Sequence, residues 1–217
     1  MSDQNTQQLN APTSDLLSDI RSIMGADGSL AKICKFLVRI VPSSGQLTQV
    51  LNSGGKGGLL RDMIYLCETA EFPGRAFNNL DGVRYYGPSF KMPYQSSYED
   101  TNLVFICRDE MYERQVFDDW MELINPTNTF DFEYKDNYTA EIQIFKLDDV
   151  YHEPTYAFSL LKAHPILVNP QQVTWSDDQF LRIGVTFTYH WWTRKGLDTQ
   201  EGTWADGNFA NLVRAAQ

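Results

Sequence analysis

The chain has 217 residues, of which 42% are hydrophobic, 21% charged and 13% aromatic, a composition that excludes a disordered or fibrous protein and allows a sizeable core. The formal net charge of −10 argues against conventional binding of nucleic-acid phosphates. No apolar run approaches the roughly 20 residues of a membrane span, and the polar N-terminus lacks the basic region of a signal peptide, so we expect no membrane anchor.

The first third of the chain predicts one helix and two strands. Residues 14–25 carry the apolar stripe of a short amphipathic helix. Residues 33–41 alternate between apolar and polar side chains, and residues 62–68 form a second apolar run; both patterns predict strands. The Gly-rich segment 52–58 lacks a Ser or Thr after Lys56, so we interpret it as a mobile loop rather than a phosphate-binding loop.

The next segment, residues 72–94, places many aromatic rings among turn-forming residues. Asp81-Gly82 predicts a tight hairpin turn. A connecting loop would be polar, and a core strand would not contain so much Gly and Pro. We therefore interpret the segment as an ordered arm whose rings pack on a partner surface. The rings in question belong to Phe72, Phe77, Tyr85, Tyr86, Phe90 and Tyr94.

A strand and the clearest helix of the chain follow. Residues 101–108 are apolar on both faces, which predicts a strand covered on both sides. Residues 109–124 predict a helix that Asp109 caps and Asn125-Pro126 ends. Its apolar face would dock on a sheet, and its acidic side chains would face away: Glu113, Asp118, Asp119 and Glu122.

Three more strands are predicted at residues 140–147, 155–163 and 180–192, the last with a long apolar and polar alternation. Strands around one central helix indicate an α+β fold, mainly an antiparallel β-sandwich or barrel. We divide the chain into an N-terminal extension (1–30), a β domain (31–193) and a C-terminal extension (194–217).

The sequence contains no catalytic, cofactor-binding or metal-binding motif. Cys34, Cys67 and Cys107 are widely spaced in apolar runs, which predicts buried free thiols. The three histidines belong to no recognisable catalytic pattern. Two other classes stay open at this point: an enzyme whose site is not contiguous in sequence, and a glycan-binding β module that uses exposed Trp and Tyr rings.

Several segments resemble the tail tube proteins of contractile-tailed bacteriophages, in the same order along the chain. They are "FPGR" (72–75), "YYGPSFKMPY" (85–94), residues 98–126, "YTAEIQIFKLD" (138–148) and residues 163–192. The helix "DEMYERQVFDDW" and the final block are the most specific parts. Over residues 33–192 the chain resembles the major tail tube protein, and nearly as well the baseplate tube initiator, which has the same fold.

The resemblance implies a structural virion protein, assembled in the host cytoplasm, that is not an enzyme and needs no cofactor. Copies would form a hexameric ring whose sheets join around a channel, and rings would stack into the inner tube of the tail. The partners implied are further copies of the chain, the tail sheath protein, and baseplate and tail-terminator proteins. DNA would pass through without specific binding.

Two sets of residues then acquire expected roles. The aromatic side chains of the arm would anchor it on a neighbouring subunit or on the next ring. Polar faces of barrel strands would line the channel, because they stay hydrated without pairing with phosphate. We expect this lining to comprise Glu141, Gln143, Thr186 and Thr188.

Overall fold

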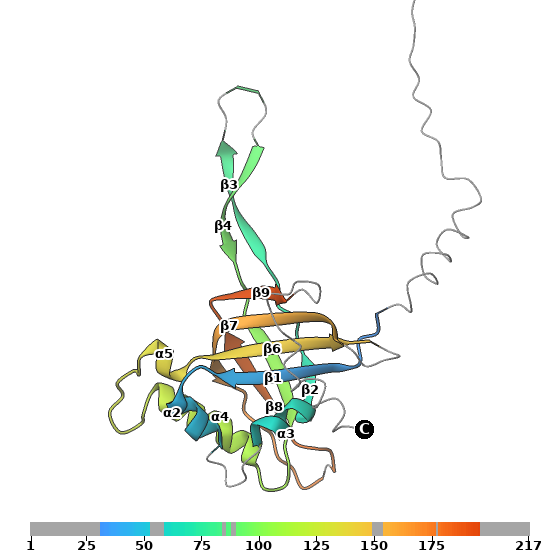
Figure 1. Ribbon diagram of the computed structural model, residues 1–217, viewed down its shortest axis with the longest axis vertical. Coiled ribbons are helices and arrows are strands. Elements are labelled where there is room, and N and C mark those ends of the chain that lie inside the picture. The colour runs from blue at the N-terminus through green and yellow to red at the C-terminus, as the bar shows by residue number, and fades with distance from the viewer. Residues whose placement is uncertain are drawn as a thin grey trace, which may run out of the picture.

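The computed structural model describes residues 31–52, 59–83, 86–87, 90–148, 154–176 and 178–195 (Figure 1). The predicted helix 14–25 and residues 53–58 of the predicted loop lie outside this part. The strands are β1 (Phe36–Pro42), β2 (Cys67–Ala70), β3 (Ala76–Val83), β4 (Phe90–Ser97), β5 (Thr101–Ile106), β6 (Ala140–Leu147), β7 (Pro154–Val168), β8 (Arg182–Thr188) and β9 (Trp191–Lys195). The helices are α2 (Gly45–Asn52), α3 (Leu59–Leu66), α4 (Tyr112–Ile124) and α5 (Lys135–Tyr138).

The main sheet is antiparallel and bent along β7. Its strand order is β1-β6-β7-β8-β5-β2, and β9 also pairs with β7. The first part of β7 pairs with β6 and β9, and its last part, His164–Val168, pairs with β8. We call β1, β6, β9 and the first part of β7 the β6 half, and β2, β5, β8 and the end of β7 the β8 half. The strands of the two halves cross at a steep angle in Figure 1.

The hydrophobic core lies between these two halves and against α4. The β6 half contributes Val38, Ile142 and Leu160, and the β8 half contributes Phe105 and Phe187, all buried in one cluster. Every second residue of β6 and β8 faces this core, as the period of a strand requires. The mainly antiparallel β fold with helices is therefore confirmed.

Helix α4 closes one end of the core with two aromatic rings. The Trp120 ring lies 5.9 Å from that of Phe187, and the Phe117 ring lies 5.2 Å from that of Phe105. The indole Nε1 of Trp120 donates a hydrogen bond of 2.8 Å to the carbonyl oxygen of Tyr138, so its burial leaves no unpaired polar group. None of the described helices is long and apolar enough to cross a membrane.

The predicted strand at 62–68 is wrong, because Leu59–Leu66 form α3 and only Cys67 begins a strand. The helix α2 just before it was not predicted, so the expectation of one central helix is wrong in the described part of the chain. A short apolar run fits the period of a helix as well as that of a buried strand. Met63 of α3 is buried in the core, and Leu60 packs against it.

The predicted turn at Asp81-Gly82 is also wrong in position. Strand β3 continues through both residues to Val83, which pairs with Phe90. The register shifts between Leu80 and Val83, and Gly82 has a φ of +84°. Gly82 therefore supplies the left-handed backbone of a β-bulge, which requires the same residue type as a hairpin turn.

Helix α4 begins later than predicted, and this changes the role of one carboxylate. Met111, with a φ of 55°, occupies the N-cap position instead of Asp109. Glu113 does not face away from the core but is 0% exposed. Its carboxylate accepts hydrogen bonds from the backbone N–H of Arg108 (3.0 Å) and from the Nε of the same residue (2.6 Å). The buried charge is thus paired at the positive end of the helix.

Three other strand predictions need smaller corrections. Strand β7 runs from Pro154 to Val168, five residues beyond the predicted end at residue 163. The expected long strand 180–192 is interrupted at residues 189–190, and beyond the break Trp192, not Trp191, packs on the core. Strand β5 is not fully covered on both faces: Leu103 and Phe105 are buried, whereas Asn102, Val104 and Ile106 on the other face are half-buried.

Candidate assembly surfaces

Strands β3 and β4 form a separate two-stranded sheet that projects from one end of the body (Figure 1). We call this hairpin the arm. The predicted anchors Phe77, Phe90, Tyr94 and Tyr86 are all exposed large hydrophobic side chains. The side chain of Tyr85 lies outside the described residues. The arm is too thin to bury these rings within itself, since one hairpin has no second layer.

Phe72, the first predicted anchor, lies at the root of the arm rather than on its projecting part. Its ring is 5.1 Å from that of Phe158, which in turn lies 5.5 Å from the ring of Trp192. Trp192 Nε1 donates a hydrogen bond of 3.0 Å to the carbonyl oxygen of Gly74. The arm is therefore fixed to the β6 half where it leaves the body.

Two further apolar side chains of the arm were not predicted. Leu80 opposes Met92 across the hairpin, and both are exposed. Phe90 is two residues from Met92, so these three side chains share one face of the hairpin. The sequence could have placed Leu80 and Met92 on the same face only if the pairing of β3 with β4 had been predicted correctly. The turn predicted at Asp81-Gly82 implies a different pairing.

Glu141 and Gln143 lie on the face of β6 that points away from the core. Gln143 is only 7% exposed, and its Nε2 donates a hydrogen bond of 2.9 Å to Oε1 of Glu141. The hydroxyl of Ser159 on β7 donates to the same carboxylate oxygen. Phe145 and Ala157 are buried on this face as well. The predicted pair is thus part of a mostly buried surface with its own polar network.

Thr186 and Thr188 lie on the outer face of β8 and are half-buried. Arg182 begins the same strand, and its Nη2 donates to Oε1 of Glu68 on β2 over 3.0 Å, with a second bond from Nε. The hydrogen bond from Arg182 lowers the pKa of the Glu68 carboxyl, which keeps this ion pair charged on both sides. The positive charge of Arg182 is therefore neutralised within the chain.

The structure does not bring the four predicted channel residues together in one copy. The outer faces of the two sheet halves point away from the core that lies between them, so they point in opposite directions. The β6 half presents Glu141 and Gln143, and the β8 half presents Thr186 and Thr188. Their role in a channel stays a prediction.

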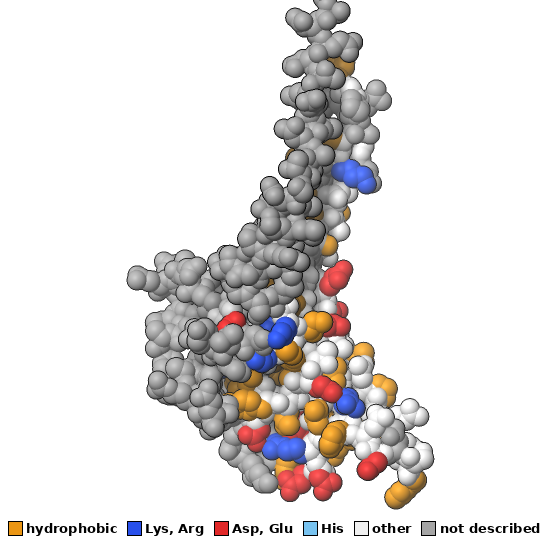
Figure 2. All heavy atoms as spheres, turned by 90° about the vertical axis from the view of Figure 1, so that its right-hand side faces the viewer, with side chains coloured by type: hydrophobic (Ala, Val, Ile, Leu, Met, Phe, Trp, Pro, Cys, Tyr) orange, Lys and Arg blue, Asp and Glu red, His pale blue; other side chains and the backbone are white. Residues whose placement is uncertain are grey.

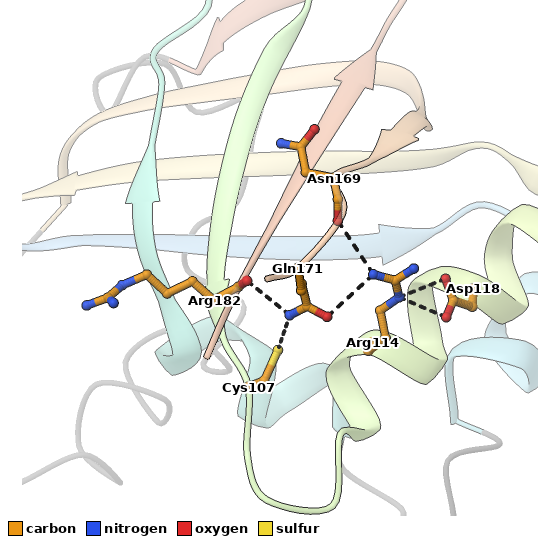
Figure 3. A network of polar contacts seen from close by, with 6 residues as sticks. All are labelled: Cys107, Arg114, Asp118, Asn169, Gln171 and Arg182. Atoms are coloured by element: carbon orange, nitrogen blue, oxygen red, sulfur yellow. Dashed lines mark hydrogen bonds and ion pairs between the residues drawn. The ribbon is translucent and has the colours of Figure 1, made fainter. Parts of the chain in front are cut away.

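A polar network fastens the connection between β7 and β8 to helix α4 (Figure 3). Gln171 Nε2 donates to the carbonyl oxygen of Arg182 (3.0 Å) and to Sγ of Cys107 (3.4 Å). Arg114 on α4 donates to Oε1 of Gln171 (3.4 Å) and to the carbonyl oxygen of Asn169 (3.5 Å). Burial raises the pKa of the Cys107 thiol, so the sulfur stays protonated and neutral inside this network.

Among the described residues, the side chains that could bind a metal ion do not cluster. Within the described ranges, no group of three His, Cys, Asp or Glu side chains could hold a metal ion. The three cysteines are free as predicted, although Cys34 is exposed rather than buried. Burial raises the pKa of the Cys67 thiol to about 12, which suppresses the nucleophilic thiolate.

The fold is that of tube-type components of contractile injection systems. One similar solved structure is a chain of an extracellular contractile injection system sheath/tube terminator, with a TM-score of 0.55, 13% identity, and coverage of 78% of this chain and 99% of that one. A chain of the sheath-tube complex of such a system gives a TM-score of 0.53, 13% identity, and coverage of 81% and 97%. A chain of the anti-feeding prophage baseplate gives 0.52, 11% identity, and coverage of 79% and 99%. At these identities the likeness concerns the fold.

The sequence comparison identifies the family. Residues 31–195 match the sequence profile of the family described as phage tail tube protein. The chain therefore belongs to the phage tail tube protein family, whose members are structural proteins of the virion. No curated protein sequence matches the chain.

Proposed function

We propose that the chain forms the inner tube of a contractile phage tail and that this tube conducts DNA into the host. Copies close into a hexameric ring in which the sheets of neighbours join, and rings stack into the tube. The observation that carries the proposal is the projecting arm with its exposed rings, because such a surface requires a partner. Closure of the sheets around a ring also removes their unpaired edges.

The arm supports assembly more directly than any other described element. An isolated hairpin is at best marginally stable in water, so packing on another chain is what would hold this one in place. Its rings are attached to a rigid root through Phe72 and Trp192, which limits the conformational entropy lost on binding. We propose Phe77, Tyr86, Phe90 and Tyr94, with Tyr85, as the anchors on a neighbouring copy.

For the channel we propose the outer face of the β8 half. Thr186 and Thr188 are half-buried polar groups without charge, and Arg182 beside them is neutralised by Glu68. A surface of this kind stays hydrated and does not retain a polyanion. Glu141 and Gln143 would line the channel if the subunit faced the other way, but Gln143 is already buried.

The partners and the domain boundaries follow from the tube function. We propose that residues 31–193 form the tube domain, flanked by extensions, and that its outer wall meets the sheath protein. The ends of the tube would meet baseplate and terminator proteins, and assembly would occur in the host cytoplasm. Similarity to a chain of a baseplate structure favours a second candidate, the baseplate tube initiator.

Size-exclusion chromatography and negative-stain microscopy of the purified chain test the proposal. We expect rings or stacked tubes with a central channel. A monomer at every concentration that instead binds glycans would contradict it and support the glycan-binding module. The number of copies per virion relative to the sheath protein separates the repeating tube subunit from the initiator, since only the former matches the sheath in number.

A further inference from the structure

The connection between β7 and β8 exposes three large apolar side chains that no role so far explains. Trp175 is fully exposed, and Val173 and Phe180 are largely exposed. We call residues 169–176 and 178–182 the docking loop. A Trp ring held entirely in water gains nothing from the fold, and aromatic rings of this kind are typical anchors of protein interfaces.

The base of the docking loop is fixed to the body at both of its ends. Gln171 is bound to the start of β8 through the carbonyl oxygen of Arg182 and to α4 through Arg114 (Figure 3). The backbone N–H of Asn169 donates to the carbonyl oxygen of Gly184 over 2.8 Å. The Asn169 side chain fills the space above Gly184, where an added Cβ would lie 2.6 Å from its Nδ2. A preorganised loop loses less entropy on binding than a floppy one.

The docking loop and the arm lie at opposite ends of the body. The arm enters β5 at Thr101, which pairs with Phe187 near the end of β8. The docking loop enters β8 at Arg182, which pairs with Ile106 at the other end of β5. Figure 1 shows the same separation, with the arm above the sheets and α2, α3 and α4 below them.

The two elements also differ in charge. Residues 72–97 contain two arginines and one lysine against one aspartate, whereas residues 169–182 contain two aspartates and one arginine, Arg182, whose charge is paired with Glu68. Figure 2 shows a Lys or Arg side chain high on the arm, Asp and Glu side chains near its foot, and several Asp and Glu side chains with a Lys or Arg among them at the end of the body away from the arm. Opposite signs favour the encounter of these two elements in different copies.

We propose that the docking loop of one copy is the acceptor for the arm of a second copy. The contact joins two different surfaces, so it is heterologous and repeats from copy to copy in one direction. The apolar side chains of the arm pack on Trp175 and Phe180, and the basic arm lies beside Asp178. This inference rests on the proposed self-assembly and names the surface on which that assembly depends.

Photochemical cross-linking identifies the acceptor. The photoreactive residue p-benzoyl-phenylalanine replaces Phe90 in one variant and Tyr94 in another; both positions are exposed, so the fold should not change. Unlabelled and ¹⁵N-labelled copies of the variant are mixed, irradiated and digested. We expect mixed-isotope cross-links between the arm of one copy and residues 169–182 of the other. Cross-links to a different surface of the second copy would overturn the inference but keep self-assembly, and a lack of any intermolecular product would contradict both.

Complementation tests the direction of the contact. A loop variant, Trp175→Ser with Phe180→Ser, and an arm variant, Phe90→Ser with Tyr94→Ser, should each raise the concentration needed for assembly at least about tenfold. Their melting temperatures should match that of the wild type, because the altered side chains are exposed. Mixed together, the two variants should form a one-to-one complex in ultracentrifugation, through the intact arm of the loop variant and the intact loop of the arm variant.

The matched control is Phe130→Ser with Phe132→Ser, which removes two equally exposed rings from the loop after α4. This control should assemble at the wild-type concentration. The inference would be overturned if the loop variant assembled at the wild-type concentration. It would also be overturned if the control needed as high a concentration to assemble as the loop variant.

Discussion

Glu113 is a carboxylate with no exposed surface, so its hydrogen-bond partners matter for the stability of the fold. It binds two donors of Arg108, whose guanidinium also lies 2.9 Å from Asp62 on α3. One acidic residue thus connects the end of β5, the first turn of α4 and helix α3. The hydrogen bond that Arg108 donates to Glu113 is the main cause that raises the pKa of Arg108, which favours its charged form.

We predict that Glu113→Ala lowers the free energy of unfolding by about 3 kcal/mol, because it leaves the partly buried backbone N–H and the Nε of Arg108 without their acceptor. Glu113→Gln should lose less, since it keeps one acceptor. Asp118→Ala removes an exposed ion pair with Arg114 and should cost less than about 1 kcal/mol. Urea unfolding measures all three, and an equal loss in Glu113→Ala and Asp118→Ala would refute the buried role.

His164 should make stability depend on pH. Burial at the bend of β7 lowers its pKa below the ordinary 6.5, with Lys135 nearby acting in the same direction and Asp100 against it. The unfolded chain therefore binds the proton at a higher pH than the folded chain. Stability should fall as the pH decreases through the range just below 6.5. His164→Gln should remove this decrease in the free energy of unfolding between pH 7 and pH 5, measured by urea unfolding at each pH. An unchanged dependence on pH would exclude His164 as its source.

At the scale of elements, α4 and the bend of the sheet determine the core. The sequence predicted β6 at its observed bounds and the end of α4 at Asn125, because long periodic patterns with a clear stop are unambiguous. The prediction from sequence was wrong at α3, where a short apolar run fits the period of a helix as well as that of a strand. It was also wrong at Asp81-Gly82, because a β-bulge and a hairpin turn both need a glycine in the left-handed conformation. The arm rings were recognisable from composition, whereas Trp175 and Phe180 needed the fold to show that they are exposed.

Trp120 links α4 to the β8 half, and Trp120→Ala should lower the free energy of unfolding by about 3–5 kcal/mol. The Trp120 side chain is 0% exposed and packs on Phe187, and it donates a hydrogen bond to the carbonyl oxygen of Tyr138 that the variant would lack. Thermal and urea unfolding of the monomer provide the measurement. If the monomer melts normally and only assembly is lost, Trp120 belongs to an interface rather than to the core.

The variant Gly82→Ala tests whether the arm contributes to the stability of the body. It places a side chain at a φ of +84°, which strains the bulge by about 1 kcal/mol. Because the arm pairs with no strand of the main sheet, the melting temperature should stay unchanged while assembly weakens. A lower melting temperature would show that the arm contributes to the stability of the body.

For the whole molecule, the distribution of charge determines which face could line the proposed DNA channel. We predict that Thr186→Lys with Thr188→Lys leaves assembly possible but makes the channel retain DNA, with a retention that weakens steeply as salt increases. The comparison pair, Glu141→Lys with Gln143→Lys, changes the opposite face and should not retain DNA in the channel. Retention by the comparison pair alone would reverse the proposed orientation of the subunit.

The continuity of β7 has a mechanical consequence for the proposed tube. One strand belongs to both sheet halves, so a force on one half reaches the other through covalent bonds as well as through side-chain packing. If the β8 half lines the channel as proposed, the inner and outer layers of each subunit are joined by the backbone of β7, which resists sliding of one layer over the other.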